Sequence, residues 1–292
     1  MKTKILLFVT MLSIVTFVGC NSNENVDEST TSAAITADET AVNSEIDATV
    51  DDVSIIAEDQ YDVQKSASST AKTTAGMVSM LPVCATITKV LTNDTWTRTI
   101  DFGTQGCALP NGNIVKGKII ISFSKNFTTP IRTISYTLEG FYHNDKLIEG
   151  NKTITHELKT SDLLATIHPV TTHSVDVKIT YPDGKIYTRI GTRVREMVEG
   201  FATLTNWEDN VFKVWGYNIT TFPNGSKYTS KITTPLLVKL SCKMPFPVSG
   251  VVSIQKNDNV DTIATLDYGN GDCDKLATMT VKGVSKVITL RK

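Results

Sequence analysis

Apolar and polar residues alternate along most of the chain beyond residue 76, which is the period of a half-buried β-strand. Thr, Val, Ile and Tyr are frequent in these segments, as on pleated surfaces with one buried face. This part of the sequence has no long helical period, and no alternation of strands with helices that would indicate a parallel sheet. The clearest alternating segments are 118–123, 131–141, 174–181, 211–219 and 251–255.

Turn dipeptides separate the alternating segments. Asn-Gly and Asp-Gly pairs favour tight hairpins, because both central residues of such a turn take positive φ. Successive hairpins predict a mainly β fold, an antiparallel meander of about a dozen strands, arranged as a sandwich, an open barrel or one long curved sheet. The dipeptides are Asn111-Gly112, Asn144-Asp145, Asp183-Gly184, Asn224-Gly225 and Asn270-Gly271.

One sequence unit occurs twice in this β region. Residues 101–107 read Asp-Phe-Gly-Thr-Gln-Gly-Cys, and residues 267–273 read Asp-Tyr-Gly-Asn-Gly-Asp-Cys. A further cysteine precedes each copy, Cys84 or Cys242, followed by an apolar alternating segment and an Asn-Asp pair. Self-similarity of this kind indicates structural repetition, so we expect a duplicated β unit.

Within each unit, the Asp-aromatic-Gly motif predicts a turn. We expect Asp101 and Asp267 to bond to backbone amides of the turns that they open. Gly103 and Gly269 are expected to take a backbone conformation that a side chain disfavours. The aromatic residue between the Asp and the Gly of each motif is expected to pack into the core.

The start of the chain has the features of an export signal over residues 1–19. Two lysines precede an apolar run at 5–18, which is too short for a stable membrane span. Cys20 directly after Gly19 is typical of a bacterial lipoprotein signal, so we expect Cys20 to be lipidated and to anchor the protein to a membrane. An ordinary signal peptide with a coincidental cysteine is the alternative.

The other four cysteines favour two disulfides, since an even number in an exported chain usually forms bridges. A bridge inherited by both copies of the unit must lie within each copy. Of the three pairings, the duplication therefore selects Cys84–Cys107 and Cys242–Cys273. No Cys-x-x-Cys pair supports a zinc site.

Residues 20–76 are predicted to form an acidic tether. From 21 to 64 there are twelve Asp or Glu and no Lys or Arg, and low hydrophobicity with charge of one sign predicts a flexible spacer. An apolar stripe at helical spacing, with Ser44 as a cap, leaves two alternatives: a short helix that docks on the domain or on a partner, or a fraying helix in a linker. The stripe is Ile46, Val50, Val53 and Ala57.

The β domain is expected over residues 77–292, where Lys and Arg outnumber Asp and Glu. We interpret the excess of Lys and Arg as basic residues spread over strand faces and edges, where lysines prevent edge-to-edge pairing of sheets. Attraction to a glycan or a polyanion is the alternative. We expect no nucleic-acid partner.

Candidate chemistry is sparse. The sequence has no nucleophile elbow, phosphate loop or zinc-protease helix, and no cofactor is predicted. The four histidines are expected at surface or hairpin positions. Trp96 and Trp207 lie beside turn residues and are the exposed aromatic candidates for stacking on a sugar.

A calcium loop is the one metal candidate. Asn270, Asp272 and Asp274 stand two apart, like the first ligands of such a loop. However, Lys275 stands where the loop needs glycine, and Val281 where it needs glutamate. We therefore expect a tight turn and no metal at these residues.

The motifs together resemble a family of uncharacterised lipoproteins from Bacteroidota. The resemblance covers roughly residues 80–290, and the chain departs from it at 242–248, where the family is shorter. It implies a Gram-negative envelope and the outer membrane, and it brings no activity and no site residues. The motifs are Cys84-Ala-Thr-Ile-Thr, Thr99-Ile100-Asp101-Phe102-Gly103 with Cys107, and Leu266-Asp267-Tyr268-Gly269 with Gly271, Cys273 and Asp274.

These observations lead to a non-enzymatic envelope or surface lipoprotein that acts as a binding or structural module. The alternative is a hydrolase for polysaccharide or peptide whose site is assembled from distant residues. A third hypothesis is an assembly subunit that offers a sheet edge to a partner strand.

Overall fold

A computed structural model describes residues 34–68 and 77–291, all within one unit of the chain, 32–292. Among the described residues, one long helix, α1 (Ala37–Ser68), precedes the strands. A single-turn 3-10 helix, η1 (Leu240–Cys242), follows β10. The strands are β1 (Thr86–Thr92), β2 (Thr95–Asp101), β3 (Cys107–Ala108), β4 (Ile114–Ser124), β5 (Ile131–His143), β6 (Lys146–Lys159), β7 (His168–Thr180), β8 (Ile186–Glu199), β9 (Val211–Thr221), β10 (Lys227–Lys239), β11 (Ser249–Lys256), β12 (Asn259–Asn270), β13 (Leu276–Val281) and β14 (Val284–Thr289).

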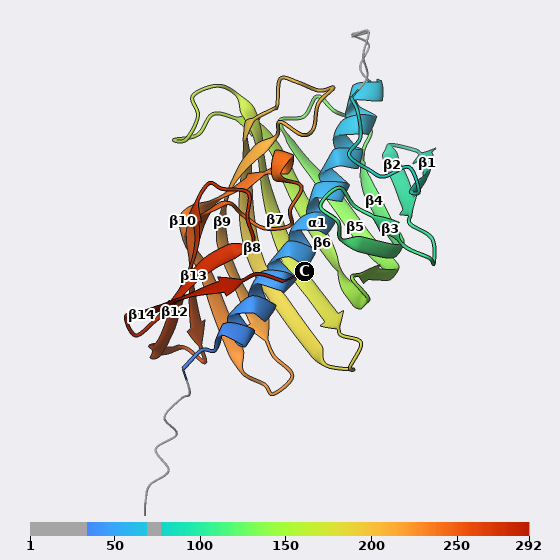
Figure 1. Cartoon of the computed structure of the whole chain (residues 1–292). Coiled ribbons are helices and arrows are strands. Elements are labelled where there is room, and N and C mark those ends of the chain that lie inside the picture. The colour runs from blue at the N-terminus through green and yellow to red at the C-terminus, as the bar shows by residue number, and fades with distance from the viewer. Residues whose placement is uncertain (1–33, 69–76, 292) are drawn as a thin grey trace, which may run out of the picture. The chain divides into compact units, whose positions relative to one another are not determined.

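The strands form one antiparallel sheet in which neighbours along the chain are also neighbours in space, with β3 paired to β4 beside the main path. The predicted meander is therefore confirmed. Of the three expected arrangements, the sheet is a single open one that curves around α1 (Figure 1). Among the described strands, β1 pairs with β2 alone and β14 with β13 alone, so these two form the edges.

A capping box starts α1. Thr36 Oγ1 accepts a hydrogen bond from the Glu39 amide at 3.1 Å, and Glu39 Oε2 accepts one from the Thr36 amide at 2.8 Å. This reciprocal pair satisfies two amides that a helix start leaves free. The cap predicted at Ser44 is wrong, since that residue lies inside the helix with its hydroxyl 3.2 Å from Tyr268 Oη.

The helix is an interior element of the fold. All four residues of the predicted apolar stripe are buried, and so are 20 of the 32 residues of α1. They share one hydrophobic core with inward-facing residues of the sheet, such as Ile119, Ile121 and Ile134. The docking alternative therefore holds for residues 37–68. The flexible spacer predicted there is not found. An isolated acidic helix would not offset the conformational entropy lost on ordering, but burial of this helix against the sheet does.

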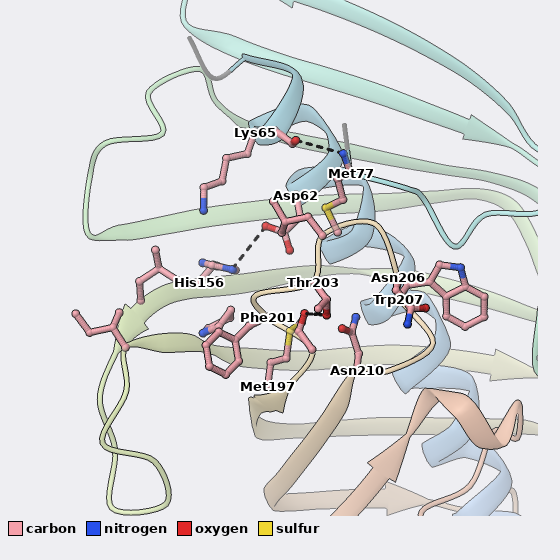
Figure 2. A pocket seen from close by; sticks show the side chains of 16 residues that line it. Asp62, Lys65, Met77, His156, Met197, Phe201, Thr203, Asn206, Trp207 and Asn210 are labelled. Atoms are coloured by element: carbon pink, nitrogen blue, oxygen red, sulfur yellow. Dashed lines mark hydrogen bonds and ion pairs between the residues drawn. The ribbon is translucent and has the colours of Figure 1, made fainter. Parts of the chain in front are cut away.

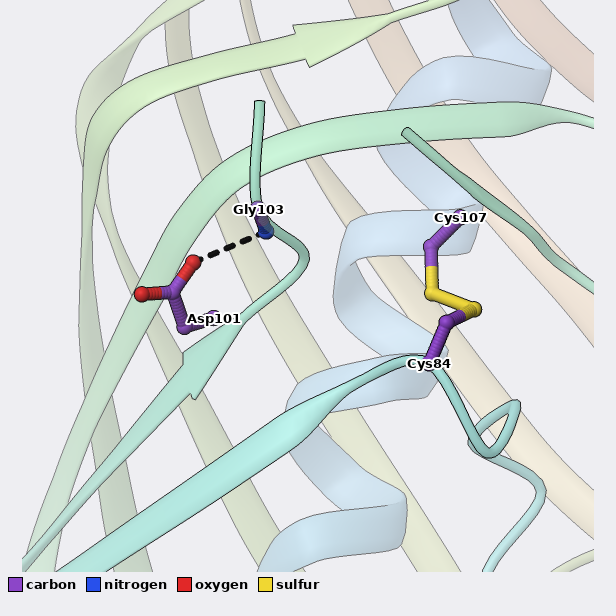
Figure 3. The surroundings of a disulfide bond; sticks show 4 residues. All are labelled: Cys84, Asp101, Gly103 and Cys107. Carbon is purple, nitrogen blue, oxygen red and sulfur yellow. Dashed lines mark hydrogen bonds between the residues drawn. A yellow bond between two sulfur atoms is a disulfide. The ribbon is translucent and has the colours of Figure 1, made fainter. Parts of the chain in front are cut away.

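Both predicted disulfides are present. Cys84 pairs with Cys107 and Cys242 with Cys273, at Cα–Cα distances of 5.9 and 5.3 Å. Figure 3 shows the first bridge beside the turn of its unit. Because each bridge lies within one copy, the pairing agrees with the duplication.

The two Asp-aromatic-Gly turns also agree with the prediction. Asp101 Oδ1 accepts a hydrogen bond from the Gly103 amide at 2.8 Å (Figure 3), and Asp267 Oδ1 accepts one from the Gly269 amide at 2.9 Å. Both glycines have positive φ, 68° and 89°. The aromatic residue between the Asp and the Gly of each motif, Phe102 or Tyr268, is buried.

Candidate ligand-binding site

Carboxylates of α1 meet basic side chains from the inner face of the sheet. Lys146 Nζ of β6 lies 2.7 Å from Glu45 Oε1. Further pairs are Glu39–Lys256 at 3.0 Å, Asp51–Arg193 and Asp52–His143 at 2.9 Å, and Glu58–His173 at 2.8 Å. Asp47 also pairs with Arg189 and Arg193, and Glu58 with Arg195.

The arginines of this set come from one strand face. Arg189, Arg193 and Arg195 stand an even number of residues apart in β8, so their side chains point to the same side of the sheet. All three are buried. A buried charge without a partner is costly, so these arginines favour one placement of the acidic helix along the sheet.

Glu58 shows the electrostatic effect of this matching. Burial acts to raise the pKa of its carboxyl, but the charges of Arg195 and His173 outweigh burial and hold that pKa at about 2. Glu58 is therefore ionised in the folded protein at neutral pH.

Other polar groups that follow Glu58 in α1 also have partners. Asp59 accepts hydrogen bonds from the Ser79 hydroxyl at 2.6 Å and from the Met80 amide at 3.0 Å. The side-chain oxygens of Gln60 and Gln64 accept from Arg98 of β2 at 2.8 and 3.0 Å.

This close pairing of charged helix residues with partners outside α1 ends at Asp62. No described residue donates a hydrogen bond to its carboxylate, and His156 Nε2 of β6, 3.9 Å away, is the one basic group of the described residues within 4.0 Å. One turn later, Lys65 has no ion pair within 4.0 Å among the described residues. The last part of α1 thus carries charged groups that the described sheet leaves without close partners.

These groups line a pocket of about 410 Å³. Figure 2 shows Asp62 and Lys65 of α1 and His156 of β6 around it. The wall of the pocket is mostly apolar and comes from β6, β7, β8 and the loops before β7 and β9: Leu158, Ile167, Pro169, Met197, Phe201 and Leu204. Ile167 is 63% exposed and Leu158 40%, so apolar surface is accessible here.

Burial shifts the protonation of the polar end of the pocket. It raises the pKa of Asp62 to about 7, with a further increase from Glu58 and Asp59 that Lys65 and Arg132 partly oppose. It lowers the pKa of His156 to about 4, so the imidazole is neutral at neutral pH. Burial also lowers the pKa of Lys65. Asp62 therefore titrates near neutral pH beside a neutral histidine.

The two tryptophans predicted as glycan contacts are in different places. Trp207 lines the pocket from the loop before β9, and it is half-buried rather than exposed. Trp96 stands in β2, opposite Phe123 of β4, and packs against the core. The structure shows no shared surface of these two residues, because Trp96 belongs to a paired strand and not to a loop.

The residues of the candidate calcium loop, Asn270, Asp272 and Asp274, line a depression. Asp274 Oδ1 accepts a hydrogen bond from the Leu276 amide at 2.8 Å, as in a tight turn. Over residues 34–68 and 77–291, no group of three or more His, Cys, Asp or Glu is arranged to hold a metal ion.

The histidines differ most from expectation. All four are buried, which corrects their prediction as surface or hairpin residues. Three have a close acidic partner: His143 with Asp52, His168 with Glu196 and His173 with Glu58. His156 Nε2 lies 3.9 Å from Asp62.

Sequence reasoning missed Asp62, Lys65 and His156 as site residues. A usable signal was present in part, since Asp51, Glu58 and Asp62 recur at helical spacing, and β8 has arginines at alternate positions. Nothing local marks His156, which acts through a partner far away in the sequence.

Cys20 lies outside the described residues, so its predicted lipidation stays a prediction. Among the described helices, none is long and apolar enough to cross a membrane. No protein-family model, no curated protein and no solved structure matches this chain.

Proposed function

We propose that the protein is a non-enzymatic envelope lipoprotein whose β domain binds a small amphipathic molecule in the pocket at the end of α1. The lipid anchor at Cys20, the outer membrane as its location and the relation to Bacteroidota lipoproteins are parts of this proposal that rest on the sequence.

One observation carries the proposal: a largely apolar pocket holds charged groups that lack close partners. Its volume of about 410 Å³ falls in the range of small-molecule sites, which bury most of a ligand against apolar walls with a few polar contacts. An apolar body on the wall and a polar group near Asp62 would match both features.

The hydrolase alternative receives no support from this pocket. Asp62 is the single carboxylate among the described residues that line it. Hydrolysis of a glycoside by the usual mechanism needs two carboxyl groups on either side of the bond that is cleaved.

Binding of N-phenylnaphthylamine, a fluorescent apolar reporter, tests the proposal. We expect saturable binding that weakens at least tenfold in Ile167→Glu and Leu158→Glu, because each places a charge on the apolar wall. Ile190→Glu is the matched control, since Ile190 is 51% exposed and lies outside the pocket. Absence of saturable binding, or equal weakening by the control, would contradict the proposal.

The anchor is tested separately. Cys20→Ala should move the protein from the detergent phase to the aqueous phase, or block its maturation, because no acyl chain is then attached. Unchanged partitioning would contradict the lipoprotein assignment without affecting the pocket.

The open edge of the sheet favours assembly as a second function. All seven residues of β1 are exposed, including Ile87, Val90 and Leu91. In the second copy of the unit, the corresponding strand β11 is covered by β10. A partner strand on β1 would complete the first copy in the same way. Light scattering of the wild type and of Val90→Lys/Leu91→Lys would show whether the edge joins two copies; a monomer in both would count against self-assembly.

A further inference from the structure

We propose that the pocket selects a ligand with a positively charged, hydrogen-bond-donating nitrogen, such as a primary ammonium on an apolar body, and that Asp62 is the residue that binds it. This inference rests on the proposed binding function and names the chemical class of the ligand.

The first support is the contrast between Asp62 and the carboxylates before it. Glu45, Glu58 and Asp59 each have a partner within 3.0 Å. For Asp62, the one basic group of the described residues within 4.0 Å is His156 Nε2 at 3.9 Å, and no described residue donates a hydrogen bond to the Asp62 oxygens. Its side chain keeps 23% of its exposure and lines the pocket. A carboxylate in this position needs donors, and the ligand can supply them.

The second support is His156. Its side chain is 2% exposed and lines the pocket, and its Nδ1 has no hydrogen-bond partner among the described residues. When Nε2 carries the proton toward Asp62, Nδ1 is a bare acceptor. At the polar end of the pocket, the Asp62 carboxylate and Nδ1 of His156 are then two acceptors that receive no hydrogen bond from a described residue. An ammonium group has three donors and no acceptor, so it complements this end.

The charges around Asp62 are of both signs. Glu58 and Asp59 of α1 add negative potential, and Lys65 of α1 and Arg132 of β5 add positive potential. Glu58 is already paired with Arg195 and His173. Lys65 is itself an ammonium on an apolar stem, held one turn away on the same helix. A ligand carboxylate would instead stand beside Asp62, where two like charges repel.

The apolar wall fits the remainder of such a ligand. Leu158, Ile167 and Phe201 present hydrocarbon surface next to the polar end. An alkyl or aromatic body would bury surface there at about 25 cal/mol per Å² of apolar area. Burial of the body would also exclude water from the ammonium–carboxylate pair and strengthen it.

Proton linkage gives this site a signature. Without ligand, the pKa of Asp62 is about 7, and an ammonium group binds the ionised form. Affinity should therefore rise with pH up to about 7 and then level off. Below that value it should fall about tenfold per pH unit, so binding at about pH 5 should be about a hundredfold weaker than at about pH 8.

Competition of three dodecyl probes against the reporter tests the inference: dodecylammonium, dodecanol and dodecanoate. At about pH 8, when Asp62 is ionised, we expect dodecylammonium to bind tightest and dodecanoate weakest. In Asp62→Asn, the advantage of dodecylammonium and its pH dependence should both disappear. Lys65→Met should move the midpoint of the pH profile upward, because Lys65 holds the pKa of Asp62 down.

Glu208→Gln is the control, since Glu208 pairs with Lys243 next to the pocket loop and does not line the pocket. It should keep the wild-type pH profile. Equal affinity for the three probes would refute the amine selectivity and leave the apolar pocket intact. Tightest binding of dodecanoate, lost in Lys65→Met, would likewise overturn the assignment to Asp62. No binding of any probe would contradict the proposed function itself.

Discussion

Lys146 Nζ of β6 lies 2.7 Å from Glu45 Oε1 of α1, with only 6% and 8% of the two side chains exposed. The pair joins α1 to the first residue of β6, an interior strand of the sheet. Tyr181 Oη donates a further hydrogen bond to Glu45 Oε2 at 3.2 Å. Removing two charges from water is costly, and only a close, hydrogen-bonded pair offsets that cost. Lys146 and Glu45 therefore fix each other's position.

Removing one partner of this pair should destabilise the fold strongly. We expect Lys146→Met to lower the free energy of unfolding by about 3–5 kcal/mol, because the buried Glu45 carboxylate loses its close counter-charge and keeps only Arg291 Nε, 3.8 Å from its other oxygen. The double variant Lys146→Met/Glu45→Leu should recover part of this loss. Denaturant unfolding measures both effects.

An exposed pair supplies the control for that series. Lys185 Nζ lies 2.7 Å from Asp183 Oδ2, and both side chains are more than half exposed. Lys185→Met should change the free energy of unfolding by less than about 1 kcal/mol. Equal losses at Lys146 and Lys185 would show that α1 is not held by its buried pairs.

Glu58 predicts how the fold responds to acid. Its pKa is about 2 in the folded protein against an ordinary value of 4.5, so its stabilising effect is complete above about pH 4.5 and is lost as the pH falls toward 2. Glu58→Gln should reduce the steepness of unfolding with pH in this window. An unchanged pH dependence of the free energy of unfolding would contradict the pairing with Arg195.

Asp62 predicts a dependence of the opposite sign. Its pKa is raised from 3.8 to about 7, so the folded protein binds a proton that the unfolded chain releases between these values. Without ligand, its stabilising effect is therefore complete below about pH 3.8 and is lost as the pH rises through 7. Asp62→Asn should remove this loss, as measured by unfolding at several pH values. A profile identical to that of the wild type would show that Asp62 titrates normally.

The strands and turns could be predicted from sequence because their causes are local. Alternation marks β4 and β5, and the Asn144-Asp145 pair marks the turn that follows, where both residues have positive φ of 46° and 64°. The disulfides needed one further step, the duplication, which excludes crossed pairs. Both kinds of signal are contained within a short stretch of chain.

The position of α1 could not be predicted in the same way. Its acidic residues look like those of a soluble spacer until Lys146, Arg189 and Arg193 are known to face them, and those residues are far away in the sequence. The pocket depends on the same long-range step. Ile167 and Phe201 come from different loops, and only the fold places them beside Asp62.

The duplication itself makes the last prediction, which concerns the relative contributions of the two disulfides. If both copies are equivalent units, each bridge should stabilise its unit to a similar extent. The cysteines are separated by 23 and 31 positions, a difference that the chain-entropy account converts to only about 0.3 kcal/mol. Cys84→Ser/Cys107→Ser and Cys242→Ser/Cys273→Ser should therefore each lower the free energy of unfolding by about 2–5 kcal/mol.

Denaturant unfolding under non-reducing conditions measures both double variants. The wild type with both bridges reduced serves as the reference, and it should be less stable than either variant, because each variant keeps one bridge. A nearly neutral effect of one pair beside a large effect of the other would show that the two copies no longer contribute equally. In that case the shared motif would reflect a common origin of the two copies and not an equal contribution to stability. Similar losses would instead indicate that both ends of the sheet, β1–β4 and β11–β14, are stabilised in the same way.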